Sequence, residues 1–105
     1  MQNPSVVRTS VDELRRIYRE SGYEALVDSG QLTAEIETDN NPASTNGQPA
    51  GTRSQILAYT DSDGVVILRC HRYLRPDGSL GASGRPDPKW IFHGNVIYKQ
   101  ARDNG

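Results

Sequence analysis

The chain has 105 residues, and its 12 Lys and Arg side chains nearly balance its 13 Asp and Glu, for a formal net charge of -1. This length excludes two independent hydrophobic cores, and no apolar run approaches the roughly 20 residues that a membrane-spanning helix needs. A single cysteine excludes an internal disulfide, and with only two histidines it offers too few ligands for an ordinary structural zinc site. We therefore expect one domain over residues 1–105, in a reducing cytoplasm, with no cofactor, no metal and no membrane contact.

The composition also indicates which segments are loosely held. Leu, Ile, Val and Phe make up 21 of the 105 residues, which is near the lower limit for a stable core, although the small net charge argues against a disordered chain. Residues 1–9 are expected to form a loose N-terminal end, and residues 101–105 a frayed C-terminus. Residues 39–53 have no usable periodicity and are rich in Pro, Gly and Asn, which predicts a long flexible loop.

The clearest local signal is a helix that begins after Ser10. Glu13 follows Ser10 at the spacing of a capping box, in which the serine side chain accepts a hydrogen bond from the first turn. Leu14, Ile17 and Tyr18 then recur on one face of a helix, which predicts an apolar stripe that packs on another element. A glycine at position 22 is expected to end this helix, and residues 23–27 can form a further helical turn.

From residue 31 the apolar period changes to two, which is the period of a strand with one buried face. The pattern predicts strands at 31–37, 55–60, 65–74, 90–92 and 96–98, and tight turns join most of them. These elements predict an α+β fold, with the N-terminal helix packed on one face of an antiparallel meander sheet of about five strands. We expect Trp90 and Phe92 to fill the core against the helix.

The predicted strand at 65–74 separates its side chains into two faces. Leu68 and Cys70 continue a core-like face, on which the cysteine is expected to be a small buried hydrophobe. Arg69, His71 and Tyr73 lie side by side on the opposite face. Because residues two apart on a strand are about 6.5–7 Å apart, these three side chains can converge on one small group.

Arginine, histidine and tyrosine together suit an anionic ligand. Arg69 can hold a phosphate, His71 can move a proton near neutral pH, and Tyr73 can stack on a base. The leading hypothesis is therefore a binding domain for an anionic ligand, with RNA as the preferred one and with Arg85 and Lys89 as further contacts. The same residues permit weak, metal-free phosphodiester cleavage, in which His71 is the acid or base and Arg69 stabilises the developing charge.

Two other interpretations stay open. The three side chains can simply keep a strand end in solvent, or the domain can be a non-enzymatic protein–protein module such as an inhibitor or an adaptor. The near-neutral charge argues against avid, non-specific binding of duplex DNA, because such domains are strongly basic. The oligomeric state is not predicted.

The order of one helix followed by an antiparallel sheet with basic and aromatic residues is similar to that of small bacterial RNase toxins. The similarity covers architecture and residue types and includes no diagnostic motif, so no residue role is taken from it. It implies a bacterial, RNA-directed domain. A metal trio of His71, His93 and Asp87 is not demanded by any spacing in the chain.

Overall fold

The computed structural model describes residues 3–40, 47–81 and 84–101. Its elements follow the chain in the order β1 (Ser5–Thr9), α1 (Val11–Glu20), α2 (Tyr23–Asp28), β2 (Thr33–Asn40), β3 (Arg53–Thr60), β4 (Val66–Leu74), β5 (Asp87–His93) and β6 (Val96–Gln100). The predicted α+β class is confirmed. Every predicted strand is present, and each is longer or shifted by one to three residues at its ends.

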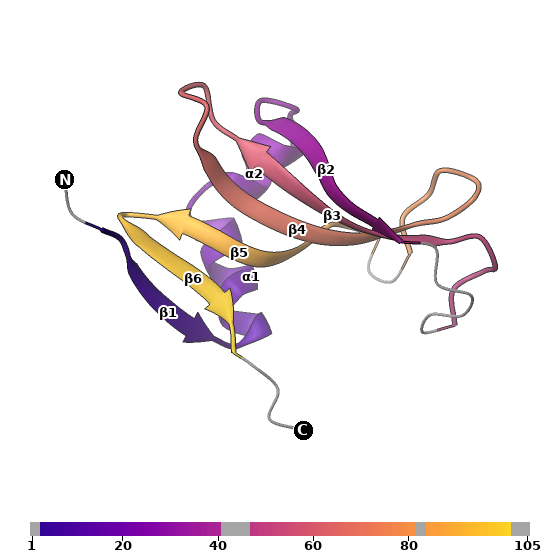
Figure 1. Ribbon diagram of the computed structural model, residues 1–105, viewed down its shortest axis with the longest axis horizontal. Coiled ribbons are helices and arrows are strands. Elements are labelled where there is room, and N and C mark those ends of the chain that lie inside the picture. The colour runs from indigo at the N-terminus through magenta and orange to yellow at the C-terminus, as the bar shows by residue number, and fades with distance from the viewer. Residues whose placement is uncertain (1–2, 41–46, 82–83, 102–105) are drawn as a thin grey trace.

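All six strands belong to one sheet, in the order β1-β6-β5-β4-β3-β2 (Figure 1). Strands β2 to β6 pair antiparallel with their neighbours in the chain, as a meander requires. The prediction of a purely antiparallel sheet of about five strands was wrong, because β1 adds a sixth strand that runs parallel to β6. Ser5 lies beside Val96 and Thr9 beside Gln100, so backbone pairing holds most of the N-terminal segment that was expected to be loose.

Helix α1 forms as the sequence predicts. The Ser10 side chain accepts a 3.1 Å hydrogen bond from the backbone N–H of Glu13, and Leu14, Ile17 and Tyr18 are the buried residues of the helix. Gly22 follows with a positive φ of 85°, a conformation that glycine adopts without strain, and the chain turns there into α2.

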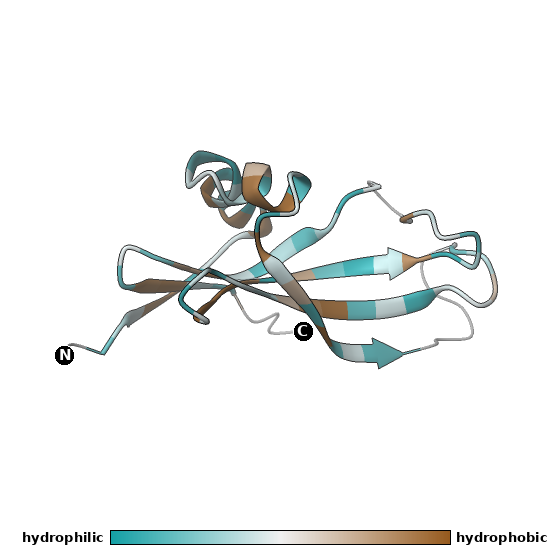
Figure 2. Cartoon of the chain, turned by 90° about the horizontal axis from the view of Figure 1, so that it is seen from above, coloured by the Kyte–Doolittle hydropathy of each residue, from teal (hydrophilic) through white to brown (hydrophobic). Residues whose placement is uncertain are grey.

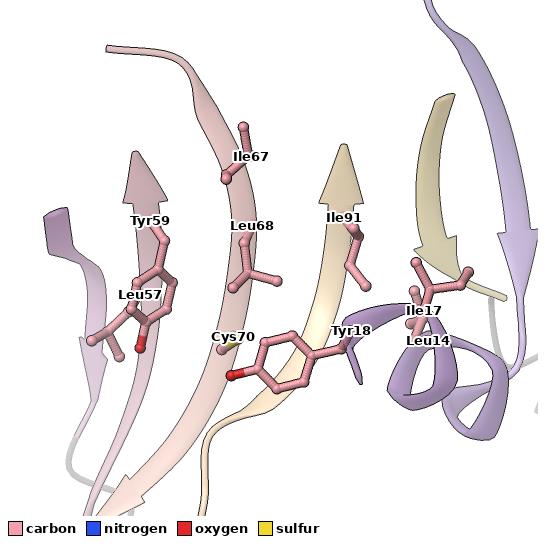
Figure 3. Close-up of a cluster of buried hydrophobic side chains, with 9 residues drawn as sticks. All are labelled: Leu14, Ile17, Tyr18, Leu57, Tyr59, Ile67, Leu68, Cys70 and Ile91. Carbon is pink, nitrogen blue, oxygen red and sulfur yellow. The ribbon is translucent and has the colours of Figure 1, made fainter. Parts of the chain in front are cut away.

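Both helices lie on the same side of the sheet (Figure 2). In the described part of the chain, no helix covers the opposite side of the sheet, which we call the helix-free face. On the covered side, Leu68, Cys70 and Ile91 are fully buried, and Figure 3 shows Tyr18 of α1 reaching toward Cys70. The predicted burial of Cys70 is confirmed, and burial raises the pKa of its thiol to about 12, which keeps it protonated and unreactive.

The prediction that Trp90 fills the core against the helix was wrong. Ile91 takes that place and is fully buried in the same cluster as Leu14 and Ile17 (Figure 3). Since successive strand residues point to opposite faces, Trp90 belongs to the helix-free face. Phe92 is half-buried and packs against the core cluster.

The edge strand β2 was predicted to be half-buried, and that was also wrong. All eight of its residues are exposed, including Ile36 at 48%. No described strand pairs with the outer edge of β2. Helix α1 packs mainly against β5 and β6, which lie nearer the other edge of the sheet. The alternation of apolar and polar residues therefore predicts the β2 strand correctly but does not predict that one face of it is buried.

The predicted loop at 39–53 is shorter than expected at both ends, because Asn40 still belongs to β2 and Arg53 opens β3. An ion pair of 2.6 Å joins Arg53 to Asp39 across these two strands. Residues 41–46 of the loop and 102–105 of the C-terminus lie outside the described residues. Neither described helix is long and apolar enough to cross a membrane.

Candidate functional site

The alternation of β4 holds through the whole candidate site. Its pairing with β3 runs without a break from Leu74 beside Arg53 to Leu68 beside Tyr59. The pairing of β4 with β5 is irregular at the site, where Arg69 faces Trp90 but the next residue, Cys70, faces Pro88. The extra residue of this bulge is therefore in β5, and β4 stays regular. Because Cys70 faces the helices, Arg69, His71 and Tyr73 share the helix-free face.

Arg69 is held between two neighbours on this face. Its Nε donates a 2.8 Å hydrogen bond to Glu37 of β2, and its guanidinium carbon lies 4.5 Å from the centre of the Trp90 ring. Its side chain is 33% exposed, so one side of the guanidinium remains open to solvent. Stacking on an indole fixes the plane of a guanidinium and leaves its edge available for hydrogen bonds.

His71 has two side-chain neighbours. Its Nε2 lies 2.7 Å from the hydroxyl oxygen of Ser54 on β3, and its ring meets that of Tyr73 edge-on, with 4.6 Å between ring centres. Burial, and next the charge of Lys89, lower the pKa of His71 below its usual value, against the opposing effect of Asp87. The ring is therefore neutral at pH 7. Sequence analysis missed Ser54, because it becomes a neighbour of His71 only through the β3–β4 register.

A cleft of about 240 Å³ opens where β5 separates from β4. Pairing of these strands ends at His71 and Asp87, and beyond that point the loop after β4 returns, with the Gly81 N–H donating to the Tyr73 carbonyl at 2.8 Å. The cleft is lined by the side chains or backbone of Arg15, His71, Arg72, Tyr73, Gly81, Arg85, Asp87 and Lys89.

The cleft brings together four of the five predicted site residues and leaves one outside. His71, Tyr73, Arg85 and Lys89 line it, whereas Arg69 lies farther along the helix-free face with Trp90. Of the three side chains that the sequence analysis expects to converge, His71 and Tyr73 line the cleft, and Arg69 lies outside it; the two expected further contacts, Arg85 and Lys89, line the cleft. His71 and Tyr73 belong both to the cleft and to the helix-free face.

Arg15 and Arg72 are cleft residues that sequence analysis missed. Arg72 occupies a core-like face of β4, and a charged residue on such a face is a signal that could have been read. Arg72 Nε donates to the amide oxygen of Gln55 at 2.8 Å. Arg15 comes from α1, and its position at the cleft depends on helix packing that periodicity does not predict.

Asp87 is the one carboxylate among the residues that line the cleft. It accepts from Arg15 Nε at 2.9 Å and from Lys89 Nζ at 3.2 Å. Burial alone would raise the pKa of Asp87, but these two cations outweigh that effect and lower the pKa below its usual value. The cleft lining thus holds four cationic side chains and one acid that is ionised at pH 7, and its net charge is positive.

The structure does not bring the two histidines together. His93 lies 5.5 Å from the ring centre of Tyr23, near the β5–β6 turn, and takes no part in the cleft. Within residues 3–40, 47–81 and 84–101, no group of three His, Cys, Asp or Glu side chains is placed to hold a metal ion.

No protein-family model, curated protein or solved structure matches this chain.

Proposed function

We propose that this domain binds single-stranded RNA across the helix-free face of β4 and β5. The observation that carries the proposal is the row formed by Trp90, Arg69, His71 and Tyr73 on a sheet face that no described helix covers. Aromatic rings and a guanidinium on an open sheet offer stacking surfaces for unpaired bases and a cation for the phosphate between them.

The ion pair of Arg69 with Glu37 is compatible with phosphate binding by Arg69. The side chains are 33% and 37% exposed, and an ion pair with that access to solvent contributes only about 0–1 kcal/mol. A phosphate can therefore replace the Glu37 carboxylate at small cost, while the stacking on Trp90 keeps the guanidinium in place. The weak net charge of the chain suits a short strand, whose few phosphates need few cations.

The same residues support weak, metal-free cleavage of the bound strand. A neutral His71 can accept the proton of a ribose 2′-hydroxyl as that oxygen bonds to the neighbouring phosphorus and the bond from phosphorus to the 5′-oxygen breaks. The released 5′-oxygen takes its proton from water or from the protonated His71, and the Arg69 side chain, two residues away, can stabilise charge on the phosphate. Among the described residues, no second histidine stands beside His71 to protonate the leaving group. RNA binding is therefore the main activity that we propose, and cleavage of the bound RNA is a slow secondary activity.

A protein-binding role is the second candidate, and one observation favours it. The outer edge of β1 has no partner strand among the described residues, and its Val6 and Val7 are 55% and 41% exposed. An open edge with apolar side chains suits the addition of a strand from a partner protein.

The setting that we propose for the protein is a reducing cytoplasm. The buried Cys70, which forms no disulfide, agrees with it.

A titration panel separates the two candidates. Labelled single-stranded RNA, single-stranded DNA and duplex RNA are titrated with the protein at low and moderate salt, and amide resonances are followed by NMR. RNA binding predicts an affinity that falls with salt and shifts confined to β4 and β5. If none of the nucleic acids binds the folded protein, the RNA proposal is wrong and the β1 edge becomes the site to pursue.

A further inference from the structure

We infer that the cleft between β4 and β5 is a site for a terminal phosphate, the phosphomonoester at the end of an RNA strand or on a free nucleotide. The inference deepens the proposed function and rests on it for the RNA, but not for the phosphate. It assigns the cleft a ligand class, whereas the proposed function concerns the open sheet face beside it.

The four cations of the cleft come from different parts of the chain. Arg15 comes from α1, Arg72 from β4, Lys89 from β5, and Arg85 from the segment before β5, yet all four line one cleft. In a chain whose net charge is only -1, such a convergence of cations is unfavourable unless an anion shares the space. Asp87 is the one carboxylate among the residues that line the cleft. Two longer ion pairs, Arg15 with Asp12 at 3.7 Å and Arg85 with Glu24 at 3.6 Å, each include a side chain that is 65% or more exposed, so they offset the positive charge only weakly.

Asp87 itself marks where an anion fits. Its two oxygens already receive Arg15 and Lys89, which shows that these side chains can grip an oxyanion from two sides. The other two cations have different partners. Arg72 is held by the neutral amide of Gln55, and Arg85 lies 3.6 Å from Glu24 with its side chain 65% exposed. Both line the cleft and can contact a second anion placed next to Asp87.

Arg72 is also built into the fold more firmly than a surface cation. Its partner Gln55 is only 2% exposed, and the neighbouring acid in the same row, Asp39, is paired with Arg53 at 2.6 Å. The guanidinium is thus oriented by a buried amide, while its charge is left without a carboxylate in direct contact among the described residues. The Asp39 carboxylate attracts the Arg72 charge only without direct contact. A guanidinium oriented in this way at a cleft wall is a typical element of a phosphate site.

The size and the neighbours of the cleft favour a strand end over an internal phosphate. A volume of about 240 Å³ is below that of an ordinary small-molecule pocket and suits a phosphate with part of its nucleoside. A phosphomonoester carries up to about two negative charges at pH 7, against one for a phosphodiester, so the same cations hold it more strongly. His71 and Tyr73 connect the cleft to the helix-free face, along which the rest of the strand would run.

The test compares strand ends. An eight-nucleotide RNA is prepared with a 5′-phosphate, with a 3′-phosphate or with hydroxyls at both ends, and binding to the full chain is measured by fluorescence anisotropy at two salt concentrations. We expect one phosphorylated form to bind about tenfold more tightly than the hydroxyl form, the gain from one charge-assisted contact. Inorganic phosphate and AMP should compete, and adenosine should not.

Two variants locate the effect. Arg72→Gln and Arg85→Gln should each reduce the preference for the phosphorylated end to about threefold or less. Arg19→Gln, on the exposed side of α1 and outside the cleft, is the matched control and should keep the full preference. Far-UV circular dichroism checks that each variant is folded, and in the unmodified protein the amide resonances of Gly81 and Lys89 should shift with AMP but not with adenosine.

The outcomes distinguish the two proposals. Equal affinity for all three RNAs, with no competition by phosphate or AMP, overturns the inference about the cleft and leaves RNA binding on the sheet face intact. If AMP shifts the cleft resonances while no RNA binds, the phosphate site stands and the RNA proposal fails. A preference for phosphorylated ends that survives in both cleft variants also overturns the inference.

Discussion

Arg15 in α1 and Asp87 at the start of β5 are 72 positions apart in the sequence and are joined by a hydrogen-bonded ion pair of 2.9 Å. This contact ties the helix to the sheet at the rim of the cleft. It also orients the Arg15 guanidinium toward the position where we place the phosphate.

Replacing Asp87 tests the structural part of this contact. The pKa of Asp87 is lowered in the folded protein, so its contribution to stability is present above the unfolded-state value of about 3.9 and is lost as the pH falls through the lower folded-state value. Asp87→Asn should therefore lower the free energy of unfolding by about 1 kcal/mol at pH 7 and by much less near pH 3. Urea unfolding at the two pH values measures the difference. An equal loss at both would show that the effect is not electrostatic.

The packing of α1 gives a second prediction. Leu14 is fully buried beneath the sheet, so Leu14→Ala should lower the free energy of unfolding by about 2–4 kcal/mol. The control is Val6→Ala on the exposed edge strand, where the side chain is 55% exposed and the change should be below about 0.5 kcal/mol. Chemical denaturation of both variants decides the point, and similar values for the two would contradict the packing described here.

Arg69 is the residue that most directly tests RNA binding on the sheet face. Arg69→Ala should weaken binding and reduce the slope of log affinity against log salt by about one phosphate contact. Removing Glu37 instead should do the opposite, because Glu37→Gln releases the guanidinium from its 2.8 Å partner. Anisotropy titrations over a range of salt concentrations measure both. A Glu37→Gln variant that binds RNA less well than the original protein would contradict the proposed replacement of carboxylate by phosphate.

His71 tests the cleavage step. Because a proton carrier acts mainly in the transition state, His71→Ala should abolish any cleavage and leave most of the binding intact. Burial lowers the pKa of His71, and a base works when it is unprotonated, so cleavage should persist at pH values below 6.5, where an ordinary histidine becomes protonated. A pH profile of RNA cleavage measures this. A rate that falls off at or above pH 6.5 would show that another group carries the proton.

The elements that could be predicted from the sequence are those whose signals are local. The capping pair Ser10 and Glu13, the stripe of Leu14, Ile17 and Tyr18, and the alternation of β4 depend on residues one to four positions apart, and each is present as predicted. The predicted face of Arg69, His71 and Tyr73 follows from the same alternation.

The other features of the fold and of the site depend on contacts between segments far apart in the sequence. Pairing of β1 with β6 joins residues 5–9 to residues 96–100, and no local sequence pattern in either segment predicts that the two will pair. The bulge in β5 and the burial of Ile91 set the face of Trp90, and the separation of β5 from β4 opens the cleft. These features depend on contacts between distant segments, whose free energy comes from packing and backbone pairing in the assembled sheet rather than from the preference of any one stretch of chain.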